Sequence, residues 1–436
     1  MSLETPERIR MLQKKLYSKA KKEPDYRFYL LYDKIYREDI LAHSWALAKA
    51  NAGAPGVDGE TFEQIESAGV EEWLNGIRAD LRQRTYRPNP VRRVMIPKAG
   101  GGERPLGIPT IRDRVVQTAA KLVIEPIFEA DFEPEAYGYR PGRSAQNAVE
   151  KVQQHLRDGY TDVVDADLSK YFDTIPHGPL MQSVARRIVD RDVLHLIKMW
   201  LTVPIEEQQG NGTSRWTGGA GSACGTPQGG VISPLLANIY MNRFLKYWRQ
   251  TGRDAQFRAR IVTYADDFVI LSHDHAAEAM EWTRTVMSRL GLTMNAEKTS
   301  IRHARHDRFD FLGYTFGPHC YVPKGSWYLS ASPSKRSIAR LKHKVRDLLR
   351  PHEMGSWPAV RDRLNRMLRG WANYFSCGTR TQAYQAVDYY VSNGVRQFLR
   401  RRHKVSSRGT QRFSHQDVFG SLGVLSLRRW QRGAVS

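Results

Sequence analysis

Two adjacent carboxylates between two apolar runs are the strongest chemical signal in this chain. The segment 260–271 reads RIVTYADDFVIL, so Asp266 and Asp267 fall at the turn of a predicted β-hairpin. Like charges at a buried turn are costly unless a cation neutralises them, and Mg²⁺ is the usual cation where phosphates are also bound. An isolated acidic pair more often marks a solvent-exposed turn, so a metal site also needs a carboxylate from a second strand end.

A second carboxylate stands at the end of another apolar run, far upstream of the first pair. Residues 163–173 read VVDADLSKYFD, which predicts a strand that ends near Asp167. Two-metal phosphoryl transfer needs carboxylates from separate strands around two ions that lie roughly 4 Å apart. We therefore predict that Asp167, Asp266 and Asp267 are catalytic and bind two Mg²⁺ ions.

Short strands and helices must position these acids. Strands are expected over 91–96, 163–168, 261–264, 268–271 and 309–316, and helices over 114–128, 233–249 and 276–290. A glycine-rich turn, KAGGGER at 98–104, follows the first of these strands. The pattern indicates an α+β fold whose strands are too scattered along the chain for a simple repeat.

Composition excludes several classes of protein. The chain has 436 residues, of which 41% are hydrophobic, and no apolar run approaches the ~18–20 residues of a membrane span. Its three cysteines form no CxxC pair, which excludes a disulfide scaffold and a multi-cysteine zinc module. With 67 Lys and Arg against 45 Asp and Glu, the formal net charge is +22. We expect a protein of a reducing compartment with no membrane contact and a polyanionic partner.

Most of the positive charge lies in the C-terminal hundred residues. Residues 335–370 hold 11 Lys or Arg against three acids, and residues 389–436 hold ten against one. Solvated surfaces usually intersperse both signs, so a phosphate-binding face explains this excess better. After Pro333 apolar residues recur at intervals of three and four, which predicts three amphipathic helices with basic outer faces. A flexible connection is expected at 406–410.

Ten sequence blocks stand out along the chain: AGAPGVDG (52–59), IPKAGGGERPLGIPTIRD (96–113), EPIFE (125–129), AYGYRPGRS (136–144), DADLSKYFDTIPH (165–177), GTPQGGVISPLLAN (225–238), YADDFVIL (264–271), NAEKT (295–299), FDFLGY (309–314) and GWANYFS (370–376). In content and order they resemble blocks of the reverse transcriptases of bacterial group II introns, also called intron maturases. The resemblance extends from about residue 40 to about residue 430. The last block resembles the signature of the maturase thumb, or X, domain.

The resemblance implies a right-hand polymerase with an antiparallel palm sheet. It divides the chain into an N-terminal extension (1–60), fingers and palm (61–330), a helical thumb or X domain (331–395) and a basic, DNA-binding-like tail (396–436). The implied activity is RNA-directed DNA synthesis from dNTPs on an RNA template with a DNA primer. The implied maturase role is binding of the parent group II intron RNA, in splicing and in mobility by target-primed reverse transcription at a DNA target. A cytoplasmic, nucleoid-associated bacterial location is expected.

The resemblance also assigns roles to residues in and around the palm. Asp167 and Asp266 resemble the direct Mg²⁺ ligands, with the Leu168 carbonyl as a backbone ligand and Asp267 as a third, more indirect carboxylate. Phe172 resembles the steric gate that excludes a ribose 2′-hydroxyl. Nucleotide binding is further expected of the side chains of Lys98, Arg104, Gln228 and Lys298, the last of which is a candidate phosphate or carboxylate partner.

Two further groups are expected to contact nucleic acid. Leu312, Gly313 and Tyr314 resemble the primer grip, where a tight turn contacts the primer backbone. The clustered Arg400, Arg401 and Arg402 are expected to track phosphates, with target DNA as the ligand that the resemblance implies.

Two alternatives remain beside this reading. No cysteine follows Cys377 in this sequence, so we expect a match to the compact family members without the paired-cysteine endonuclease segment. One alternative is a reverse transcriptase recruited to phage defence, CRISPR adaptation or DNA repair. The other is a non-catalytic RNA-binding splicing factor, which the intact Asp167, Asp266 and Asp267 disfavour.

Overall fold

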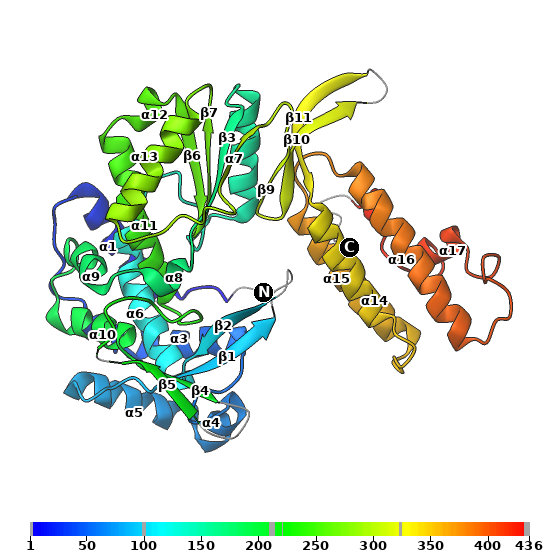
Figure 1. Ribbon diagram of the computed structural model, residues 1–436. Helices are drawn as coiled ribbons and strands as arrows, with labels where there is room; N and C mark the ends of the chain where they lie inside the picture. The colour runs from blue at the N-terminus through cyan, green and yellow to red at the C-terminus, as the bar shows by residue number, and fades with distance from the viewer. Residues whose placement is uncertain (1–2, 98–101, 209–213, 220, 322–324, 431–436) are drawn as a thin grey trace.

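The structure is a computed structural model that describes residues 3–97, 102–208, 214–219, 221–321 and 325–430. Lys98, which the sequence assigns to nucleotide binding, lies outside the described residues. Figure 1 shows fingers and palm as one mass of helices and sheets, with the helical thumb beside it across a central space. The mixed content of helices and sheets agrees with the α+β fold expected from the sequence.

The fingers combine a four-stranded sheet with N-terminal helices. The sheet has the order β2-β1-β4-β5, in which β1 pairs antiparallel with β2 and parallel with β4. Its strands are β1 (Val91–Pro97), β2 (Glu103–Ile108), β4 (Pro204–Gln208) and β5 (Ser214–Gly218). The surrounding helices are α1 (Glu7–Lys22), α2 (Tyr32–Ile35), α3 (Glu38–Asn51), α4 (Phe62–Ala68), α5 (Val70–Gln83) and α10 (Arg191–Leu201).

Helix α6 (Ile111–Glu129) lies in the hydrophobic core that the fingers and palm share. It begins at Thr110, whose hydroxyl accepts a hydrogen bond from the backbone N–H of Asp113, and most of its residues are buried. Helices α1 and α3 both pack against it, so the N-terminal segment belongs to the same hydrophobic core as the palm helices. The predicted helix over 114–128 is therefore confirmed, with one extra turn at its start.

The palm is an antiparallel sheet of order β6-β7-β3-β8. Its strands are β3 (Asp162–Asp167), β6 (Ala259–Tyr264), β7 (Asp267–Ser272) and β8 (Ser300–His303). The adjoining helices are α7 (Ala145–Arg157), α8 (Tyr171–Thr174), α9 (His177–Ala185), α11 (Ser233–Gln250), α12 (Arg253–Gln256) and α13 (Ala276–Arg289). The strands β3, β6 and β7 confirm the prediction from their apolar runs.

The single strand expected over 309–316 is wrong, because the chain turns in its middle. Strands β9 (Phe309–Phe311) and β10 (Tyr314–Tyr321) form a hairpin, and β10 pairs again with β11 (Ser326–Pro333). The turn residues Leu312 and Gly313 have φ of 51° and 78°. Two consecutive left-handed residues make a two-residue hairpin turn, which apolar residue spacing does not reveal.

The thumb contains the three amphipathic helices that the sequence predicts. They are α14 (Lys335–Leu348), α15 (Trp357–Tyr374) and α16 (Thr381–Arg402), followed by α17 (His415–Phe419) and a short 3₁₀ helix, η2 (Leu427–Arg429). The boundary expected at residue 396 falls inside α16. Val418 and Leu427 lie in the same core as the thumb helices, so residues 413–427 fold back onto the thumb.

Candidate active site

The register of the palm sheet brings the predicted acids together. In the antiparallel pair of β3 and β7, Asp167 lies directly opposite Asp267. Strands β6 and β7 pair up to Tyr264 and Asp267, which leaves Ala265 and Asp266 as a two-residue turn. Ala265 has a φ of 58°, as such a turn requires. Three carboxylates, two from the ends of the central strands β3 and β7 and one from the turn, therefore meet at one end of the palm sheet. Figure 1 shows this end of the sheet toward the central space.

Burial and mutual repulsion make this acidic cluster resist full ionisation. Asp267 is open to solvent on one side but otherwise surrounded by protein; loss of hydration, together with Asp266 and Asp167, raises its pKa to about 7. Loss of hydration also raises the pKa of Asp266. One cation is already present, since Nζ of Lys298 lies 3.0 Å from Oδ2 of Asp167. Among the described residues the three carboxylates thus have one cation at ion-pair distance, which leaves the cluster short of positive charge.

The donors around this cluster fit a hard divalent cation. Leu168 is buried and forms an isolated β-bridge with Met294. The two hydrogen bonds of this bridge run from the N–H of Ser169 to the Thr293 carbonyl and from the N–H of Asn295 to the Asp167 carbonyl. Within the described residues the Leu168 carbonyl accepts no backbone hydrogen bond, so an oxygen stays available beside the carboxylates. Yet no three His, Cys, Asp or Glu side chains in the described part of the chain have the spacing of a formed metal site. The metal-ligand roles remain predictions.

A cavity of about 760 Å³ collects three of the predicted nucleotide-binding residues. Arg104 of β2, Phe172 of α8 and Gln228 all line it. Nε of Arg104 donates to Oε1 of Gln228 at 3.0 Å, and Nε2 of Gln228 lies 3.4 Å from Oδ2 of Asp173. Gln228 is thus held between a cation and a carboxylate, and its orientation is fixed from both ends.

Two residues of this cavity were not assigned a role from the sequence. Tyr139 is 47% exposed and has a φ of 55°, and burial and the nearby Asp266 carboxylate raise the pKa of its hydroxyl. Arg336 reaches the cavity from α14 of the thumb. A sequence signal existed for Tyr139, which lies in the block AYGYRPGRS, but none pointed to Arg336.

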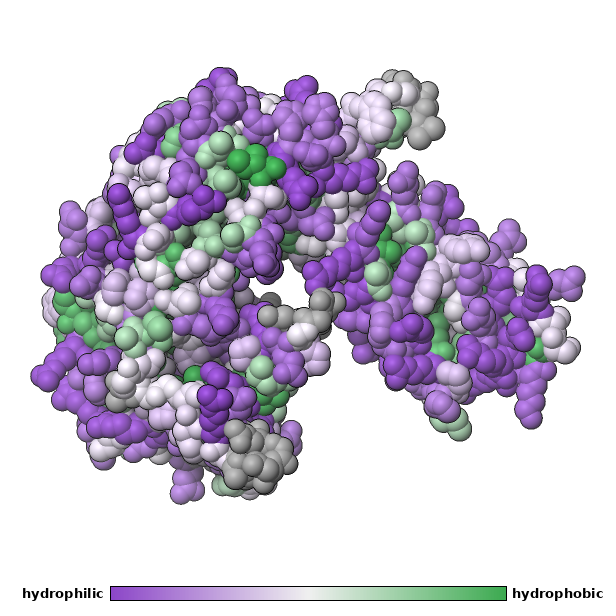
Figure 2. All heavy atoms as spheres, in the orientation of Figure 1, coloured by the Kyte–Doolittle hydropathy of each residue, from purple (hydrophilic) through white to green (hydrophobic). Residues whose placement is uncertain are grey.

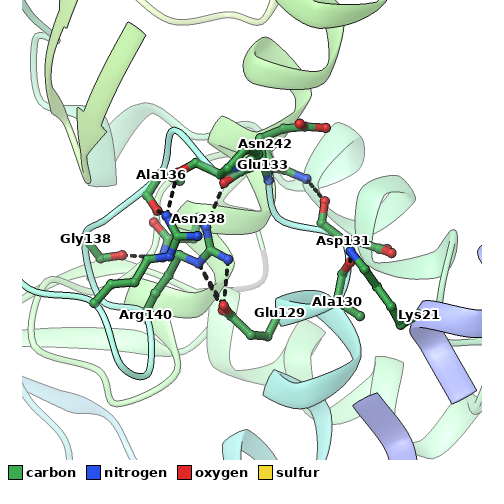
Figure 3. Close-up of polar contacts among 12 residues, drawn as sticks. Lys21, Glu129, Ala130, Asp131, Glu133, Ala136, Gly138, Arg140, Asn238 and Asn242 are labelled. Carbon is green, nitrogen blue, oxygen red and sulfur yellow. Dashed lines mark hydrogen bonds and ion pairs between the residues drawn. The ribbon is translucent and has the colours of Figure 1, made fainter. Parts of the chain in front are cut away.

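A polar network packs beside the turn of Ala265 and Asp266 (Figure 3). The guanidinium of Arg140 contacts the Glu129 carboxylate, at 2.6 Å for the shortest pair, and donates to the carbonyls of Glu133 and Ala136 at 2.7 and 2.9 Å. Asn238 of α11 donates to the Gly138 carbonyl at 2.7 Å. These contacts hold the segment 133–140 against the palm sheet.

That segment touches the turn of Ala265 and Asp266 directly. The backbones of Ala136 and Thr263 form an isolated parallel bridge, so the segment continues the sheet beyond β6. A Cβ added to Gly138 would lie 2.5 Å from the backbone nitrogen of Ala265. Only glycine therefore allows the segment to approach the residue that precedes Asp266.

The predicted primer-grip turn connects the palm to the thumb. The Gly313 carbonyl accepts hydrogen bonds from the backbone N–H of Ser334 and the hydroxyl of Ser337, at 3.0 and 2.9 Å. The Tyr314 hydroxyl donates to the Tyr374 carbonyl at 2.6 Å, and the Tyr374 hydroxyl donates to the Leu312 carbonyl at 2.9 Å. Any movement of the thumb must therefore act on this turn.

The arginines expected to bind DNA form the last turn of α16. Arg400, Arg401 and Arg402 are all exposed. Nη1 of Arg402 donates to the Gly355 carbonyl at 2.7 Å, while the Nε of Arg401 donates to the Gln397 carbonyl at 3.1 Å. Figure 2 shows that a hydrophilic hollow separates the thumb from the fingers and palm. The C-terminal end of α16, which carries these arginines, points away from the fingers and palm in Figure 1.

Comparisons with known proteins agree with this arrangement. Residues 96–316 match the family described as reverse transcriptase (RNA-dependent DNA polymerase), and residues 338–415 match the maturase-specific domain of group II introns. The chain belongs to the group II intron reverse transcriptase and maturase family. Its function class is that of an RNA-directed DNA polymerase with a maturase domain, and the resemblance seen in the sequence blocks is confirmed.

Several relatives share part of this architecture. Protein YkfC of Escherichia coli is 37% identical over 70% of this chain and 87% of its own length. The group II intron-encoded protein LtrA of Lactococcus lactis is 34% identical over 50% of this chain and 35% of its own length. An uncharacterised 91 kDa cob intron protein of Schizosaccharomyces pombe is 24% identical over 82% of this chain and 52% of its own length. The chain thus spans about half the length of the S. pombe relative and about a third of the length of LtrA.

Solved structures with some likeness include a telomerase from Candida albicans in complex with telomeric RNA, with a TM-score of 0.42 and 12% identity over 82% of this chain and 70% of that one. A partial Cas6-RT-Cas1–Cas2 complex has a TM-score of 0.35 and 24% identity over 59% of this chain and 42% of that one. Among the described residues, none of the helices combines the length and the apolar character needed to cross a membrane.

Proposed function

We propose that this family member synthesises DNA from dNTPs on an RNA template with a DNA primer, and binds its parent group II intron RNA to assist splicing and mobility. The observation that carries the proposal is the register of β3 against β7, with Asp167 opposite Asp267 beside the turn residue Asp266. A nucleotide-sized cavity, lined by Arg104 and Phe172, adjoins these acids and supports the same reading.

The proposed cofactor is a pair of Mg²⁺ ions. Asp167, Asp266, Asp267 and the Leu168 carbonyl would hold them, because these are oxygen donors at a site short of positive charge. Bound there, the ions would activate the primer 3′-hydroxyl and stabilise the developing charge on the transferred phosphate.

The chain's own residues would bind and select the nucleotide. Arg104, together with Lys98, would neutralise the triphosphate, since a guanidinium forms strong charge-assisted hydrogen bonds to phosphate oxygens. Phe172 is 6% exposed and its ring bounds the cavity, so it would exclude a ribose 2′-hydroxyl. Gln228 would contact the sugar and base in the orientation that Arg104 and Asp173 impose.

The template and primer would occupy the hollow between palm and thumb (Figure 2). The turn Leu312–Tyr314 would contact the primer backbone, and its hydrogen bonds to the thumb would couple primer position to thumb position. Intron RNA would bind the basic face of residues 335–370 and the N-terminal helices. Target DNA would bind Arg400–Arg402, which implies association with nucleoid DNA.

The proposed DNA contact can be separated from the polymerase site. Changing Arg400, Arg401 and Arg402 to Gln should flatten the dependence of DNA affinity on salt by about two units of log K per log salt. The rate of DNA synthesis at saturating template should stay unchanged. Because Arg402 also binds the Gly355 carbonyl, the Arg400→Gln/Arg401→Gln double variant is the control for loss of fold. An unchanged slope would assign this surface to solubility.

The overall proposal is tested by the RNA that accompanies the purified protein. We expect sequencing of this RNA to recover an intron that folds into group II domains, and we expect the protein to accelerate splicing of that intron at low Mg²⁺. Primer extension on the same RNA should yield DNA. Recovery of random RNA, together with primer extension, would favour a polymerase without a maturase role.

A further inference from the structure

A second cavity has a volume of about 800 Å³. Helices α9 and α11, which help to line it, lie on the side away from the thumb in Figure 1. Helices α6, α9, α11 and α13 and the chain after α1 enclose it, and we call it the α11 basin. Two acids, Asp25 and Asp131, line it. The cationic lining is larger and consists of Arg27, Arg186, Arg187, Arg243, Lys246 and Arg289.

One of the two acids already has a cationic partner. Nε of Arg187 lies 3.0 Å from Oδ2 of Asp131, and both side chains are largely buried. Asn242 fixes the backbone there, since it donates to the Asp131 carbonyl at 3.1 Å and accepts from the N–H of Glu133 at 3.0 Å (Figure 3). Arg187 and Asp131 are therefore part of the basin's frame, and the Lys246 ammonium acts with Arg187 to offset part of the rise that burial causes in the Asp131 pKa.

Five of the six cations form no ion pair in the described part of the chain. They are Arg27, Arg186, Arg243, Lys246 and Arg289. The Arg243 guanidinium lies 5.3 Å from the centre of the Tyr240 ring, and its Nη1 is buried without a hydrogen-bond partner among the described residues. Converging, unpaired cations repel one another, and a buried donor without a partner is costly. An anionic ligand would relieve both costs.

The basin also has an apolar part that a simple anion would not need. The buried side chains of Phe128, Phe132 and Ile239 form its apolar floor, and Tyr247, which is 39% exposed, is the aromatic ring among these lining residues that is open to a ligand. The Tyr247 ring stacks on Trp282 at 5.5 Å and 15°, which holds it rigid. Flat aromatic surfaces beside arginines are the features on which unpaired bases stack. The volume suits a nucleotide, since small-ligand sites span about 300–1,000 Å³.

We propose that the α11 basin binds an unpaired nucleotide of a nucleic acid strand, with its base against the aromatic wall and its flanking phosphates on the cations. The site is separate from the polymerase centre. Ser233 lines the nucleotide cavity at the start of α11, whereas Lys246 lies 13 residues further along that helix, about 20 Å away. The inference rests on the proposed function only in that the ligand is a nucleic acid.

The test measures a second binding event on the full-length protein. The polymerase site is first saturated with an RNA–DNA primer–template duplex, and a fluorescent 15-nucleotide oligouridine is then titrated at several salt concentrations. We expect the Arg186→Gln/Lys246→Gln/Arg289→Gln variant to weaken this second binding at least tenfold. Its salt slope should fall by about two, at roughly 0.7 for each lost contact to a single strand.

Matched controls separate this site from general charge and from the polymerase. The Arg82→Gln/Arg157→Gln/Lys198→Gln variant removes the same charges from exposed positions outside the basin and should bind as the wild type does. Primer extension should be unchanged in both variants, so failure of the basin and failure of the polymerase proposal are distinguishable. Since Arg186 and Arg289 are exposed, the Arg186→Gln/Arg289→Gln variant keeps the test valid if Lys246 proves structural.

Further arms identify the ligand. An oligodeoxyuridine of the same length distinguishes RNA from DNA as the source of the strand, and either result supports the proposal. The proposal is overturned if no second binding event occurs or if the triple variant binds like its control. It is also overturned if duplex RNA binds as tightly as the single strand, or if inorganic triphosphate displaces the strand with equal affinity.

Discussion

The ammonium of Lys298 lies 3.0 Å from Oδ2 of Asp167, although 131 residues separate them in the chain. Lys298 is 66% exposed and Asp167 is 26% exposed, so the pair sits at the rim of the acidic cluster rather than inside the core. A cation at this position competes with any metal ion that needs the same carboxylate. The positive charge of Lys298 should therefore lower the affinity of Asp167 for Mg²⁺.

Replacing Lys298 by Gln should strengthen metal binding. Removal of a competing positive charge lowers the Mg²⁺ concentration for half-maximal DNA synthesis, by about two- to fivefold for an exposed pair worth up to 1 kcal/mol. The measurement is a Mg²⁺ titration of primer extension at saturating dNTP. A higher Mg²⁺ requirement, or a raised KM for dNTP alone, would assign Lys298 to the nucleotide rather than to the carboxylate.

Replacing Phe172 by Val should relax the choice of sugar. Phe172 bounds the nucleotide cavity, so a smaller side chain leaves room for a 2′-hydroxyl. We expect the ratio of kcat/KM for dNTP over rNTP to fall by at least about tenfold. Because Phe172 is buried, the variant's thermal unfolding is measured alongside. A folded, active variant with unchanged discrimination would remove Phe172 from the gate.

Replacing Gly138 by Ala should slow catalysis without weakening template binding. The new Cβ would lie 2.5 Å from the Ala265 nitrogen, so the turn that carries Asp266 must shift. We expect kcat to fall at least about tenfold, because a shift of about 1 Å at a reacting group costs up to a hundredfold. The Gly178→Ala variant is the control, since a Cβ there meets nothing within 4 Å. Equal kcat in both variants would contradict the support that we assign to segment 133–140.

His155 should make stability depend on pH. Burial is the main cause that lowers the pKa of His155 from 6.5 to about 4, and the positive charges of Lys151 and Arg260 also lower it. Below pH 6.5 the unfolded chain binds a proton that the folded chain refuses until about pH 4, so stability should fall across that window as pH falls. The urea midpoint measured between pH 7 and pH 4.5 should decrease more in the wild type than in His155→Leu. Parallel decreases would exclude His155 as the cause.

Much of the palm could be predicted because its signals are local. The apolar runs around Asp167 and Asp266 are short and bounded by turns. The first forms strand β3, and the second forms the hairpin of β6 and β7. Apolar spacing alone predicted one strand over 309–316, because aromatic residues on both sides of Leu312 mimic a continuous strand, whereas the family resemblance implied a tight turn there. Left-handed backbone at a non-glycine residue leaves no trace in hydrophobic spacing.

Other features depend on contacts that no local pattern encodes. Basic composition suggested an independent tail, but Asp388, buried within α16, accepts hydrogen bonds from the N–H groups of Leu427 and Arg428 at 2.8 and 3.1 Å. Those bonds hold the tail on the thumb. Arg336 reaches the nucleotide cavity only because of how the thumb is oriented, which the sequence does not specify.

The central claim is that acids from β3 and from the β6–β7 turn perform DNA synthesis, while nucleic acid is held elsewhere. The most direct measurement compares primer extension and intron RNA binding in the wild type and in Asp266→Ala. We expect DNA synthesis to be abolished, with RNA affinity within a few-fold of the wild type, because that affinity rests on distributed cationic contacts. Retained synthesis, or a loss of RNA binding in proportion to the loss of activity, would contradict the claim.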